Sequence, residues 1–492
     1  MPSTPFFSAF GSLLFGSAPR SAAEKLRRQL LHINSLSQLQ EAFGSFIPDI
    51  LLSPSPKNAN SRERLFSTRV TFWAFLAQVL SPGCPCREIV RKVQAWFCLQ
   101  SKSSKTMSSD SSAYCQARCR LPEKTLASVH NTLAAKLQRN VSQDERWLGR
   151  DVFIVDGSTV SMPDTPKNQA AYPQPKSQKP GCGFPLMKIA AIFSLASGAL
   201  LHVARGHLRA HETGLFRQLW DELKAGCVIL ADRGFCSFFT LASLLGRNVD
   251  CVMRLSGARL LDLHAGKALG PGDRLIQWRK PKGRNFTWPE EEFAALPRTL
   301  TLRQIHYFIQ IPGFRTREVV IVTTLLDHLQ YPANALAELY FQRWSVELHF
   351  REIKTILRLD VLRCLSPEMV HRELWLHMIA YNMVRVLMQE ASHVHHVNLW
   401  HLSFKGTLDT LRHWADALHA AKNHPRKQLT LLAEMLAIIA KDTLPIRPCR
   451  VEPRAKKRRP KNYQLLTKPR REMHIVGHRN RPERKYPKTS LS

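Results

Sequence analysis

One segment near residue 350 combines an aromatic ring, a carboxylate and several cations at helical spacing. On a helix of 3.6 residues per turn, four of these side chains project from one stripe about 60° wide: Tyr340, Arg343, Glu347 and Lys354. Arg351 lies beside this stripe, whereas Glu352 projects roughly 120° away from Tyr340. The stripe also fits an ordinary solvated helix, in which each i,i+4 ion pair contributes about 0.2 to 0.5 kcal/mol. By itself, therefore, it does not distinguish a catalytic helix from a solvated one.

Two aspartates earlier in the chain offer a chemistry in which Glu347 would take part. Asp156 follows the apolar run DVFIV, and Asp232 follows CVILA. Carboxylates gathered at strand ends form an oxygen-rich site suited to Mg²⁺ or Mn²⁺, and Mg²⁺ usually keeps waters and binds substrate phosphate. Two such ions activate the attacking oxygen and stabilise the leaving oxygen in phosphodiester cleavage. Either aspartate alone fits a turn or capping residue equally well, so the pair matters more than each member.

The elements that must position these aspartates follow from hydrophobic patterning. The run 151–162 predicts a strand that ends at Asp156, and residues 186–196 and 199–206 predict a hairpin that turns at Ser197 and Gly198. Residues 211–226 have helical apolar spacing, and 227–232 predicts a strand that ends at Asp232. The expected order is thus strand, strand, strand, helix, strand, with one aspartate after the first strand and one after the fourth.

The rest of the chain divides by composition into flanking regions. Residues from about 20 to 145 show helical spacing, typical of either a DNA-binding module or a plain helical bundle. Residues 250 to 330 contain short alternating segments, and 371–391 predicts an amphipathic helix. From Arg447 to the end there are 16 Lys or Arg and three Glu. The densest basic run, AKKRRPK, fits a solubilising tail or a DNA-binding tail through four residues: Lys456, Lys457, Arg458 and Arg459.

The charge balance limits the classes of partner. The 71 Lys and Arg against 38 Asp and Glu leave a net charge of +33, which favours a polyanion, with nucleic acid as the first candidate. The sequence contains no run of 18 apolar residues, so it predicts no membrane-spanning helix. The 11 scattered cysteines indicate reduced thiols in a cytoplasmic protein, and their spacing lacks the second ligand pair of a zinc finger. No phosphate-binding loop of the GxxxxGK[ST] type is present.

With these residues in place, the chain resembles the DDE transposases of insertion-sequence family four. The spacing Y-x2-R-x3-E-x6-K from Tyr340 to Lys354 is similar to the signature helix of that family. The resemblance includes DGSTV at Asp156, DRGF at Asp232 and the long β-rich insertion before Glu347. It extends to VTFWAFLAQVLSPGCPCREIV and to RVEPRAKKRRPKNYQLLTKPR, and therefore covers nearly the full chain.

The resemblance implies an α/β fold whose catalytic core is RNase H-like, a mixed sheet with flanking helices. The implied regions are a helical, DNA-end-binding region over 1–145, the core over 146–249 and 331–440, a β-rich insertion over 250–330 and a basic tail over 441–492. Asp156, Asp232 and Glu347 would bind two Mg²⁺ or Mn²⁺ ions and catalyse nicking and strand transfer. Four residues would contact DNA: Tyr340, Arg343, Lys354 and Arg233. The implied partners are terminal inverted repeats, target DNA and a second copy on paired ends, and the implied location is the nucleoid of a bacterial cytoplasm.

One departure concerns the hairpin intermediate formed by related members. Those members stack a flipped base on a tryptophan in a strand shortly before the signature helix. The matching strand here, REVVIVTTLLD, has no tryptophan, and Trp278 and Trp288 lie earlier in the insertion. A hairpin route remains the expectation. Two alternatives stay open: a metal-dependent RNase H-like nuclease that cuts without joining, and a catalytically silent DNA-binding derivative.

Overall fold

The structure is a computed structural model that describes residues 65–100, 108–255, 265–283, 288–309, 318–421, 424–445, 466–469 and 472–473. The predicted basic run at 455–461, with Lys456 to Arg459, lies outside the described residues. So does most of the region predicted as the tail, 441–492.

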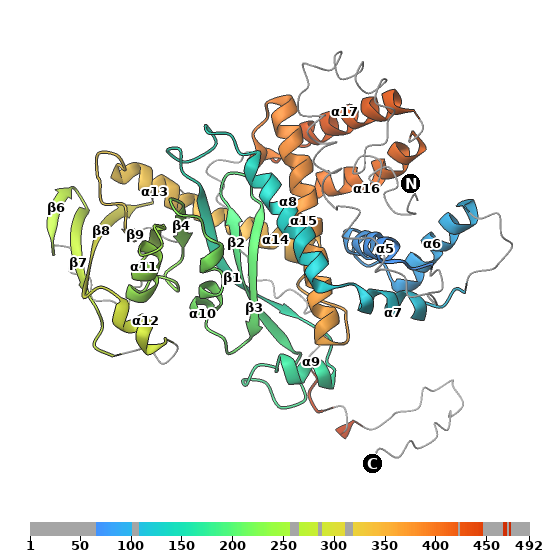
Figure 1. Ribbon diagram of the computed structural model, residues 1–492, viewed down its shortest axis with the longest axis horizontal. Coiled ribbons are helices and arrows are strands. Elements are labelled where there is room, and N and C mark those ends of the chain that lie inside the picture. The colour runs from blue at the N-terminus through green and yellow to red at the C-terminus, as the bar shows by residue number, and fades with distance from the viewer. Residues whose placement is uncertain are drawn as a thin grey trace.

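A single mixed sheet of nine strands forms the centre of the fold (Figure 1), in the order β3-β2-β1-β4-β5-β9-β8-β7-β6. Its strands are β1 (Val152–Ser161), β2 (Leu186–Ser194), β3 (Leu200–His207), β4 (Val228–Ala231), β5 (Asp250–Arg254), β6 (Lys267–Gly270), β7 (Asp273–Arg279), β8 (Thr299–Phe308) and β9 (Glu318–Thr323). Strand β1 pairs antiparallel with β2 and parallel with β4. The predicted α/β class with a mixed sheet and flanking helices is confirmed at this level.

The predicted order of strand, strand, strand, helix, strand is also present. The β2–β3 hairpin turns at Gly198, whose φ of +67° lies in the left-handed region that favours glycine. The predicted helix over 211–226 is shorter than expected. It consists of α10 (Glu212–Arg217) and a 3₁₀ turn, η1 (Trp220–Glu222), before β4 begins.

The position of Asp156 differs from the prediction. Strand β1 does not end at this residue but continues to Ser161, because Asp156 to Ser161 still pair with β2. On its other side β1 loses its neighbour, since β4 ends at Ala231, opposite Val155. Asp156 therefore lies at the point where β1 extends beyond β4.

The strands of the predicted insertion extend the same sheet. Strand β5 pairs parallel with β4, and β9 joins β5 to β8 in antiparallel pairing. Strands β6, β7 and β8 form the far edge, at the opposite end of the molecule from α5–α7 and α16–α17 (Figure 1). The sheet thus links the insertion directly to the strands that carry the two aspartates.

Helices cover both faces of the sheet and form the other end of the molecule. The N-terminal helices are α5 (Thr68–Leu80), α6 (Cys86–Gln100), α7 (Ser112–Arg120) and α8 (Glu123–Arg139). The smaller helices between strands are α9 (Pro166–Ala171), α11 (Phe238–Leu245) and α12 (Glu290–Ala295). After the sheet come α13 (Ala333–Phe341), α14 (Ser345–Arg351), α15 (Pro367–His395), η4 (Leu399–His401), α16 (Phe404–Ala420) and α17 (Pro425–Lys441).

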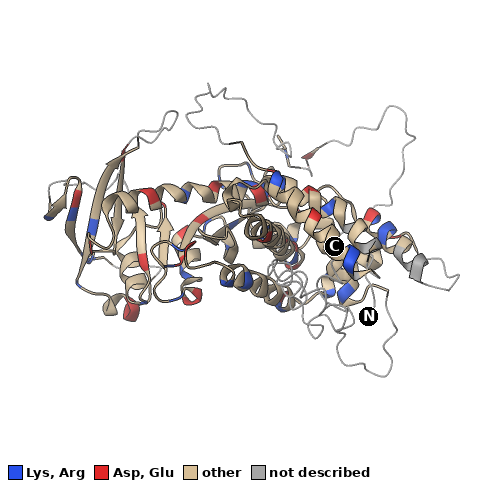
Figure 2. Ribbon diagram, turned by 90° about the horizontal axis from the view of Figure 1, so that it is seen from above, with Lys and Arg blue, Asp and Glu red and all other residues tan. Residues whose placement is uncertain are grey.

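Helix α15 is the central helix of this arrangement. It packs against α5, α8, α16 and α17, and 21 of its residues are buried. No helix within the described ranges is both long and apolar enough to cross a bilayer. Figure 2 shows Lys and Arg interspersed with Asp and Glu along helices and strands. The net positive charge is therefore not confined to one described element.

Candidate active site

Asp156 and Asp232 occupy equivalent places on neighbouring parallel strands. Val155 of β1 is in register with Ala231, the last residue of β4, so Asp156 is the next residue of β1 and Asp232 is the first residue after β4. Adjacent strands lie about 4.8 Å apart, and the two residues therefore lie side by side at the edge where β4 ends. This placement does not show that either residue is a metal ligand. It does bring together the two carboxylates that the sequence analysis singled out.

Beside Asp156, β1 has no neighbouring strand where β4 has ended, and this position is called the gap in the sheet. The backbone N–H of Gly157 donates a hydrogen bond of 2.7 Å to Oδ1 of Asp156. Burial raises the pKa of Asp156 to about 6, against the lowering effects of that hydrogen bond and of the Arg343 charge. The negative charges of Asp232 and Glu212 raise this pKa further, which indicates that carboxylates converge here.

The segment from Tyr340 to Lys354 is helical but not one regular α-helix. Between α13 and α14 lies a 3₁₀ turn, η2 (Gln342–Trp344), and after α14 comes a π-helical turn, η3 (Glu352–Ile356). A constant 3.6 residues per turn therefore does not describe the whole stripe. The change of twist alters which side chains face the sheet, and this was not predictable from the spacing alone.

Glu347 and Lys354 nevertheless lie on elements that adjoin β1. Helix α14 packs against β1, and Glu347 on it is exposed. The ammonium group of Lys354 donates a hydrogen bond of 3.1 Å to the Ser158 hydroxyl. Ser158 is two residues beyond Asp156 and therefore projects from the same face of β1. The signature segment thus packs on the face from which Asp156 projects.

Tyr340 and Arg343 are buried beneath this segment rather than displayed on its surface. Tyr340 is 0% exposed and Arg343 is 6% exposed. The Arg343 guanidinium carbon lies 5.8 Å from the centre of the Tyr340 ring and 5.3 Å from that of Trp344. Among the described residues, the Tyr340 hydroxyl and Arg343 Nε have no hydrogen-bond partner. These two polar atoms are therefore buried without a partner close to the aspartates.

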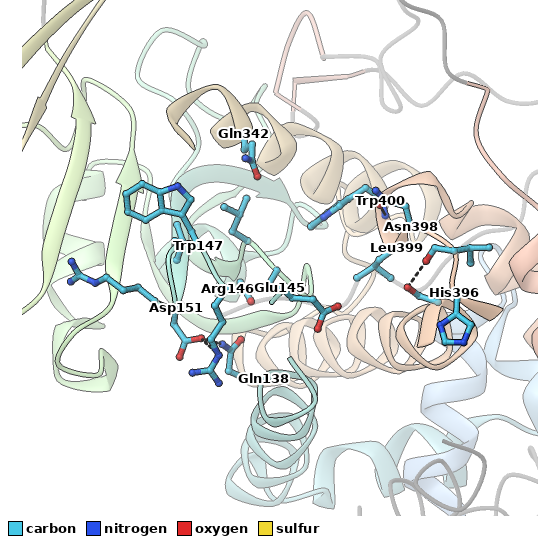
Figure 3. Close-up of a pocket in the computed structure, with 17 residues that line it drawn as sticks. Gln138, Glu145, Arg146, Trp147, Asp151, Gln342, His396, Asn398, Leu399 and Trp400 are labelled. Carbon is cyan, nitrogen blue, oxygen red and sulfur yellow. Dashed lines mark hydrogen bonds and ion pairs between the residues drawn. The ribbon is translucent and has the colours of Figure 1, made fainter. Parts of the chain in front are cut away.

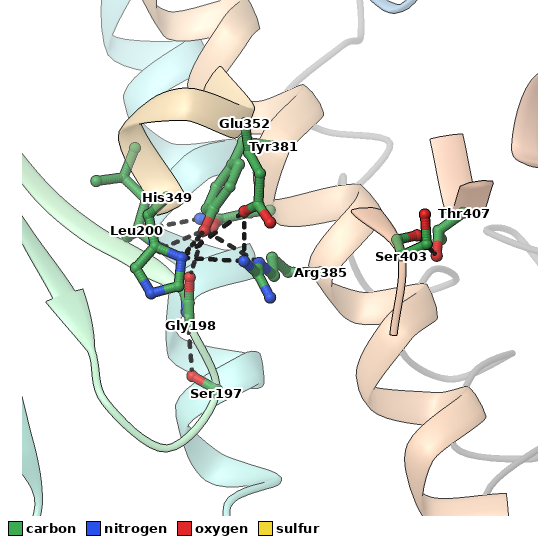
Figure 4. Close-up of polar contacts among 11 residues, drawn as sticks. Ser197, Gly198, Leu200, His349, Glu352, Tyr381, Arg385, Ser403 and Thr407 are labelled. Carbon is green, nitrogen blue, oxygen red and sulfur yellow. Dashed lines mark hydrogen bonds and ion pairs between the residues drawn. The ribbon is translucent and has the colours of Figure 1, made fainter. Parts of the chain in front are cut away.

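Glu352 has a different role from that of Glu347. It is buried and forms an ion pair with Arg385 of α15 (Figure 4). Burial by itself raises the pKa of Glu352, but the positive charge of Arg385 and its hydrogen bond to the carboxylate outweigh burial and lower it. Burial lowers the pKa of His349, which accepts a hydrogen bond of 2.9 Å at Nδ1 from Arg385. Glu352 is thus buried in a structural ion pair, whereas the side chain of Glu347 is exposed.

This buried network connects the signature segment to the β2–β3 hairpin. The Tyr381 hydroxyl donates a hydrogen bond of 2.8 Å to the carbonyl oxygen of Gly198 and accepts one of 3.0 Å from Arg385 Nε. A Cβ atom on Gly198 would lie 3.1 Å from the Arg385 guanidinium carbon, so glycine leaves room for the network. Sequence reasoning missed these residues. The only signal was the presence of charged residues such as Arg385 within an apolar helix.

Other predicted site residues are placed as follows. Arg233 is exposed immediately after Asp232. Trp288 packs against Trp220, with ring centres 5.8 Å apart, and lies 4.4 Å from the Arg217 guanidinium carbon. Trp278 lies in β7 and is partly buried against the core. Both tryptophans thus make ordinary packing contacts.

A separate cavity lies near the start of β1, on the Gln342 side of the signature segment. Its volume is about 470 Å³, and its lining includes Trp147, Asp151, Gln342 and Trp400 (Figure 3). None of the three predicted catalytic carboxylates lines it. This cavity is therefore distinct from the gap beside Asp156.

The donor set at the gap fits a hard divalent cation only in part. Asp156 and Asp232 supply neighbouring carboxylates of the kind that Mg²⁺ prefers. Within the part of the chain that the structure describes, no group of three or more His, Cys, Asp or Glu side chains lies close enough to hold a metal ion. Glu347 therefore does not complete a ligand set in this arrangement.

Comparison with known proteins agrees with this geometry. Residues 147–383, which contain both aspartates and the signature segment, match a protein-family model described as a transposase DDE domain. The chain therefore contains a transposase DDE domain. Enzymes of this family act on DNA and typically use divalent metal ions.

The transposase is similar along most of its length to a curated bacterial relative. It is 27% identical over 414 residues to the transposase InsG for insertion sequence element IS4 of Escherichia coli, which covers 83% of this chain and 89% of that one. It is 31% identical over 102 residues to the putative transposase InsL for element IS186A of Escherichia coli, which covers 20% of this chain and 28% of that one.

Among solved structures, the transposase is similar to a piggyBac transposase synaptic complex with hairpin DNA. The alignment covers 89% of this chain and 86% of that one, with a TM-score of 0.42 and 10% identity. A similarity at this level transfers no detail of mechanism.

Proposed function

We propose that the transposase nicks DNA at the ends of its own insertion sequence and then joins the freed ends to target DNA. The observation that carries the proposal is the placement of Asp156 and Asp232 side by side where β1 extends beyond β4. Strands β1 to β5 with their helices would form an RNase H-like core, which the strand order supports. In this proposal Glu347 approaches the two aspartates when DNA is bound.

The catalytic residues would act on phosphodiester bonds as metal ligands. Asp156, Asp232 and Glu347 would hold two Mg²⁺ or Mn²⁺ ions, which supply a Lewis acid and a metal-activated nucleophile. The raised pKa of Asp156 is consistent with a carboxylate in a site without its cation, because the Gly157 hydrogen bond and the Arg343 charge only partly offset its burial and its acidic neighbours. This part of the proposal therefore predicts cation binding even without DNA.

Cations around the gap would hold the scissile strand. Lys354, which lies on the Asp156 face of β1, would contact phosphate at the cleaved end, and Arg233 is exposed next to Asp232. Tyr340 and Arg343 would supply the hydroxyl and Nε that have no partner among the described residues. The tail residues Lys456 to Arg459 would add non-specific attraction to DNA.

The finer course of the reaction extends this proposal. We expect cut-and-paste transposition through a hairpin, carried out by a homodimer on paired terminal inverted repeats in a bacterial nucleoid. The packing of Trp288 against Trp220 gives no support to a base-stacking role for that tryptophan. A hairpin would therefore need another way to hold the displaced base.

The test is a strand-transfer assay with the full-length protein, Mg²⁺ and DNA that flanks its own coding region. Joined products support the transposase activity, cleavage without joining supports a nuclease, and salt-sensitive binding alone supports a silent DNA-binding derivative. We expect Asp156→Ala, Asp232→Ala and Glu347→Ala each to abolish cleavage and leave end binding intact. Glu222→Ala, which removes an exposed carboxylate before β4, is the matched control. Wild-type cleavage by any of the three variants would remove that residue from the site.

A further inference from the structure

Two cysteines of the N-terminal helices interact with each other through their side chains. Cys86 is the first residue of α6, and Cys115 lies on α7, which packs against both α5 and α6. These three helices lie together at one end of the molecule (Figure 1). Both thiols are free and partly exposed, whereas the neighbouring Cys84 is buried. Small solutes can therefore reach the pair.

Side chains from α5 and α7 bind the two sulfur atoms. Gln78 donates a hydrogen bond from Nε2 to Cys86 Sγ over 3.5 Å, and Arg118 donates one from Nη2 to Cys115 Sγ over 3.7 Å. The Gln78 oxygen accepts hydrogen bonds from Arg118 Nη1 over 3.4 Å and from the Tyr114 hydroxyl over 2.9 Å. These two donors fix the orientation of the Gln78 amide, so that its N–H group points toward Cys86.

Arg118 lacks a carboxylate partner within the described ranges. The acidic groups that act most strongly on its charge are three thiols and one phenol: Cys364, Tyr114, Cys86 and Cys115. Its guanidinium carbon lies 4.8 Å from the centre of the Phe75 ring and 5.1 Å from that of the Tyr114 ring. A partly buried cation is stabilised by a nearby anion. Because a thiol ionises more readily than a phenol, a thiolate is the anion that these neighbours supply.

The negative charge of the thiol pair falls on Cys86. Interaction with the Cys115 side chain lowers the pKa of Cys86 to about 5, and the Arg118 charge contributes, although burial opposes both. The pKa of Cys115 is raised, chiefly by Cys86. Burial raises the pKa of Cys84 to about 11. At neutral pH, Cys86 is thus a thiolate beside a protonated thiol, the arrangement of a reactive cysteine with a resolving partner.

We propose that Cys86 and Cys115 form a reversible modification site, in which a hydroperoxide oxidises Cys86 and Cys115 then closes a disulfide between α6 and α7. This inference does not depend on the proposed function. A disulfide of this kind suits a protein of a reducing compartment, where disulfides are mostly transient. No group of three or more His, Cys, Asp or Glu side chains in the described ranges could hold a metal ion, so the pair is not part of a described metal cluster.

The chemistry takes place in two balanced steps. The Cys86 thiolate attacks one oxygen of hydrogen peroxide, the O–O bond breaks, and hydroxide leaves and takes a proton from solvent to form water. Cys86 is then a sulfenic acid. The Cys115 sulfur attacks the Cys86 sulfur, the S–O bond breaks, and the hydroxyl group leaves as water with the Cys115 proton. The peroxide is thus reduced to two waters and two thiols are oxidised to one disulfide, which a thiol reductant reverses.

The first test identifies the product. Reduced full-length protein is treated with hydrogen peroxide, the remaining thiols are blocked with iodoacetamide, and linked peptides are found by mass spectrometry. We expect a Cys86–Cys115 disulfide that dithiothreitol removes. In Cys115→Ser the sulfenic acid has no resolving partner, and dimedone, which reacts with sulfenic acids, should label Cys86. Cys119→Ser removes an exposed thiol of the same helix and is the matched control, which should give the wild-type disulfide.

The second test measures the rate at which iodoacetamide alkylates Cys86 at pH 6, in the folded protein and in the urea-unfolded chain. About 90% of Cys86 is thiolate at this pH when folded, against about 0.3% of a thiol with the ordinary pKa of about 8.5. A thiolate of lower pKa is intrinsically less nucleophilic, here by about 40-fold. The folded protein should therefore react about 10-fold faster. Arg118→Met should reduce that advantage several-fold, and thermal unfolding confirms that the variant folds.

Three outcomes would overturn the inference. A disulfide from Cys86 to Cys84 or Cys119, or the lack of any disulfide at Cys86, would refute the pairing with Cys115. Alkylation of Cys86 no faster in the folded protein than in the unfolded chain would show that it is an ordinary thiol. An unchanged rate in Arg118→Met would remove Arg118 as the counter-ion of the thiolate. None of these results bears on strand transfer, so the proposed function would stand in each case.

Discussion

Glu390 of α15 is a buried carboxyl group whose ionisation should make the stability of the transposase depend on pH. It is 0% exposed, and neither of its carboxyl oxygens has a hydrogen-bond partner in the described parts of the chain. Burial raises its pKa from 4.5 to about 7, although the positive charge of Lys136 on α8 opposes this change. The folded protein therefore binds a proton at Glu390 more tightly than the unfolded chain does.

The sign and size of the effect follow from this difference. A raised pKa in the folded state stabilises the fold fully below about pH 4.5, and that contribution is lost as the pH rises through about 7. One pKa unit corresponds to about 1.4 kcal/mol, so the full loss is about 3 kcal/mol. Glu390→Gln carries no charge at any pH, and it should become more stable relative to the wild type by up to about 3 kcal/mol between pH 5 and 8.

Urea unfolding of both proteins at a series of pH values measures this change. Only the difference between them is used, because other groups titrate in both proteins alike. Glu434→Gln, which alters an exposed carboxylate on α17, is the control and should show a constant difference across the series. A constant difference between wild type and Glu390→Gln from pH 5 to pH 8 would refute the reasoning.

Further predictions concern the signature segment and the gap. Glu352→Gln should destabilise the fold by about 3 to 5 kcal/mol in urea unfolding, because it leaves Arg385 buried and unpaired, and the double variant with Arg385→Met should recover most of the loss. A double variant as unstable as the single one would contradict this. Gly157→Ala should change the melting temperature little, because its Cβ meets only the flexible end of the partly exposed Glu212 side chain, which can move aside. A large drop in melting temperature for Gly157→Ala would contradict this. Lys354→Gln should weaken DNA binding and reduce the slope of log affinity against log salt by about 1. An unchanged slope in filter binding would remove Lys354 from the phosphate contacts.

Local patterning was sufficient to predict the order of elements around the two aspartates. Apolar runs of four or five residues before Asp156 and Asp232 are long enough to form buried strands, and Gly198 marks the hairpin turn because it can adopt positive φ. The predicted position of the end of β1 was wrong, because the polar residues after Asp156 continue to pair with β2. Strand length depends on the neighbouring strand, and a single segment carries no information about its neighbour.

The sequence by itself determined which carboxylates and cations are available, and the spacing of one helical stripe. The tertiary structure decided how they are used. Glu347 and Glu352 are both acidic residues of the same segment, but only Glu352 meets Arg385 in the interior, because the facing helix comes from 33 residues further along the chain. Glu212 carries no signal in the sequence, since its place against Gly157 depends on the packing of α10 on the sheet and on the missing side chain at Gly157. Contacts between segments far apart in the chain arise only from packing, and local patterns cannot specify them.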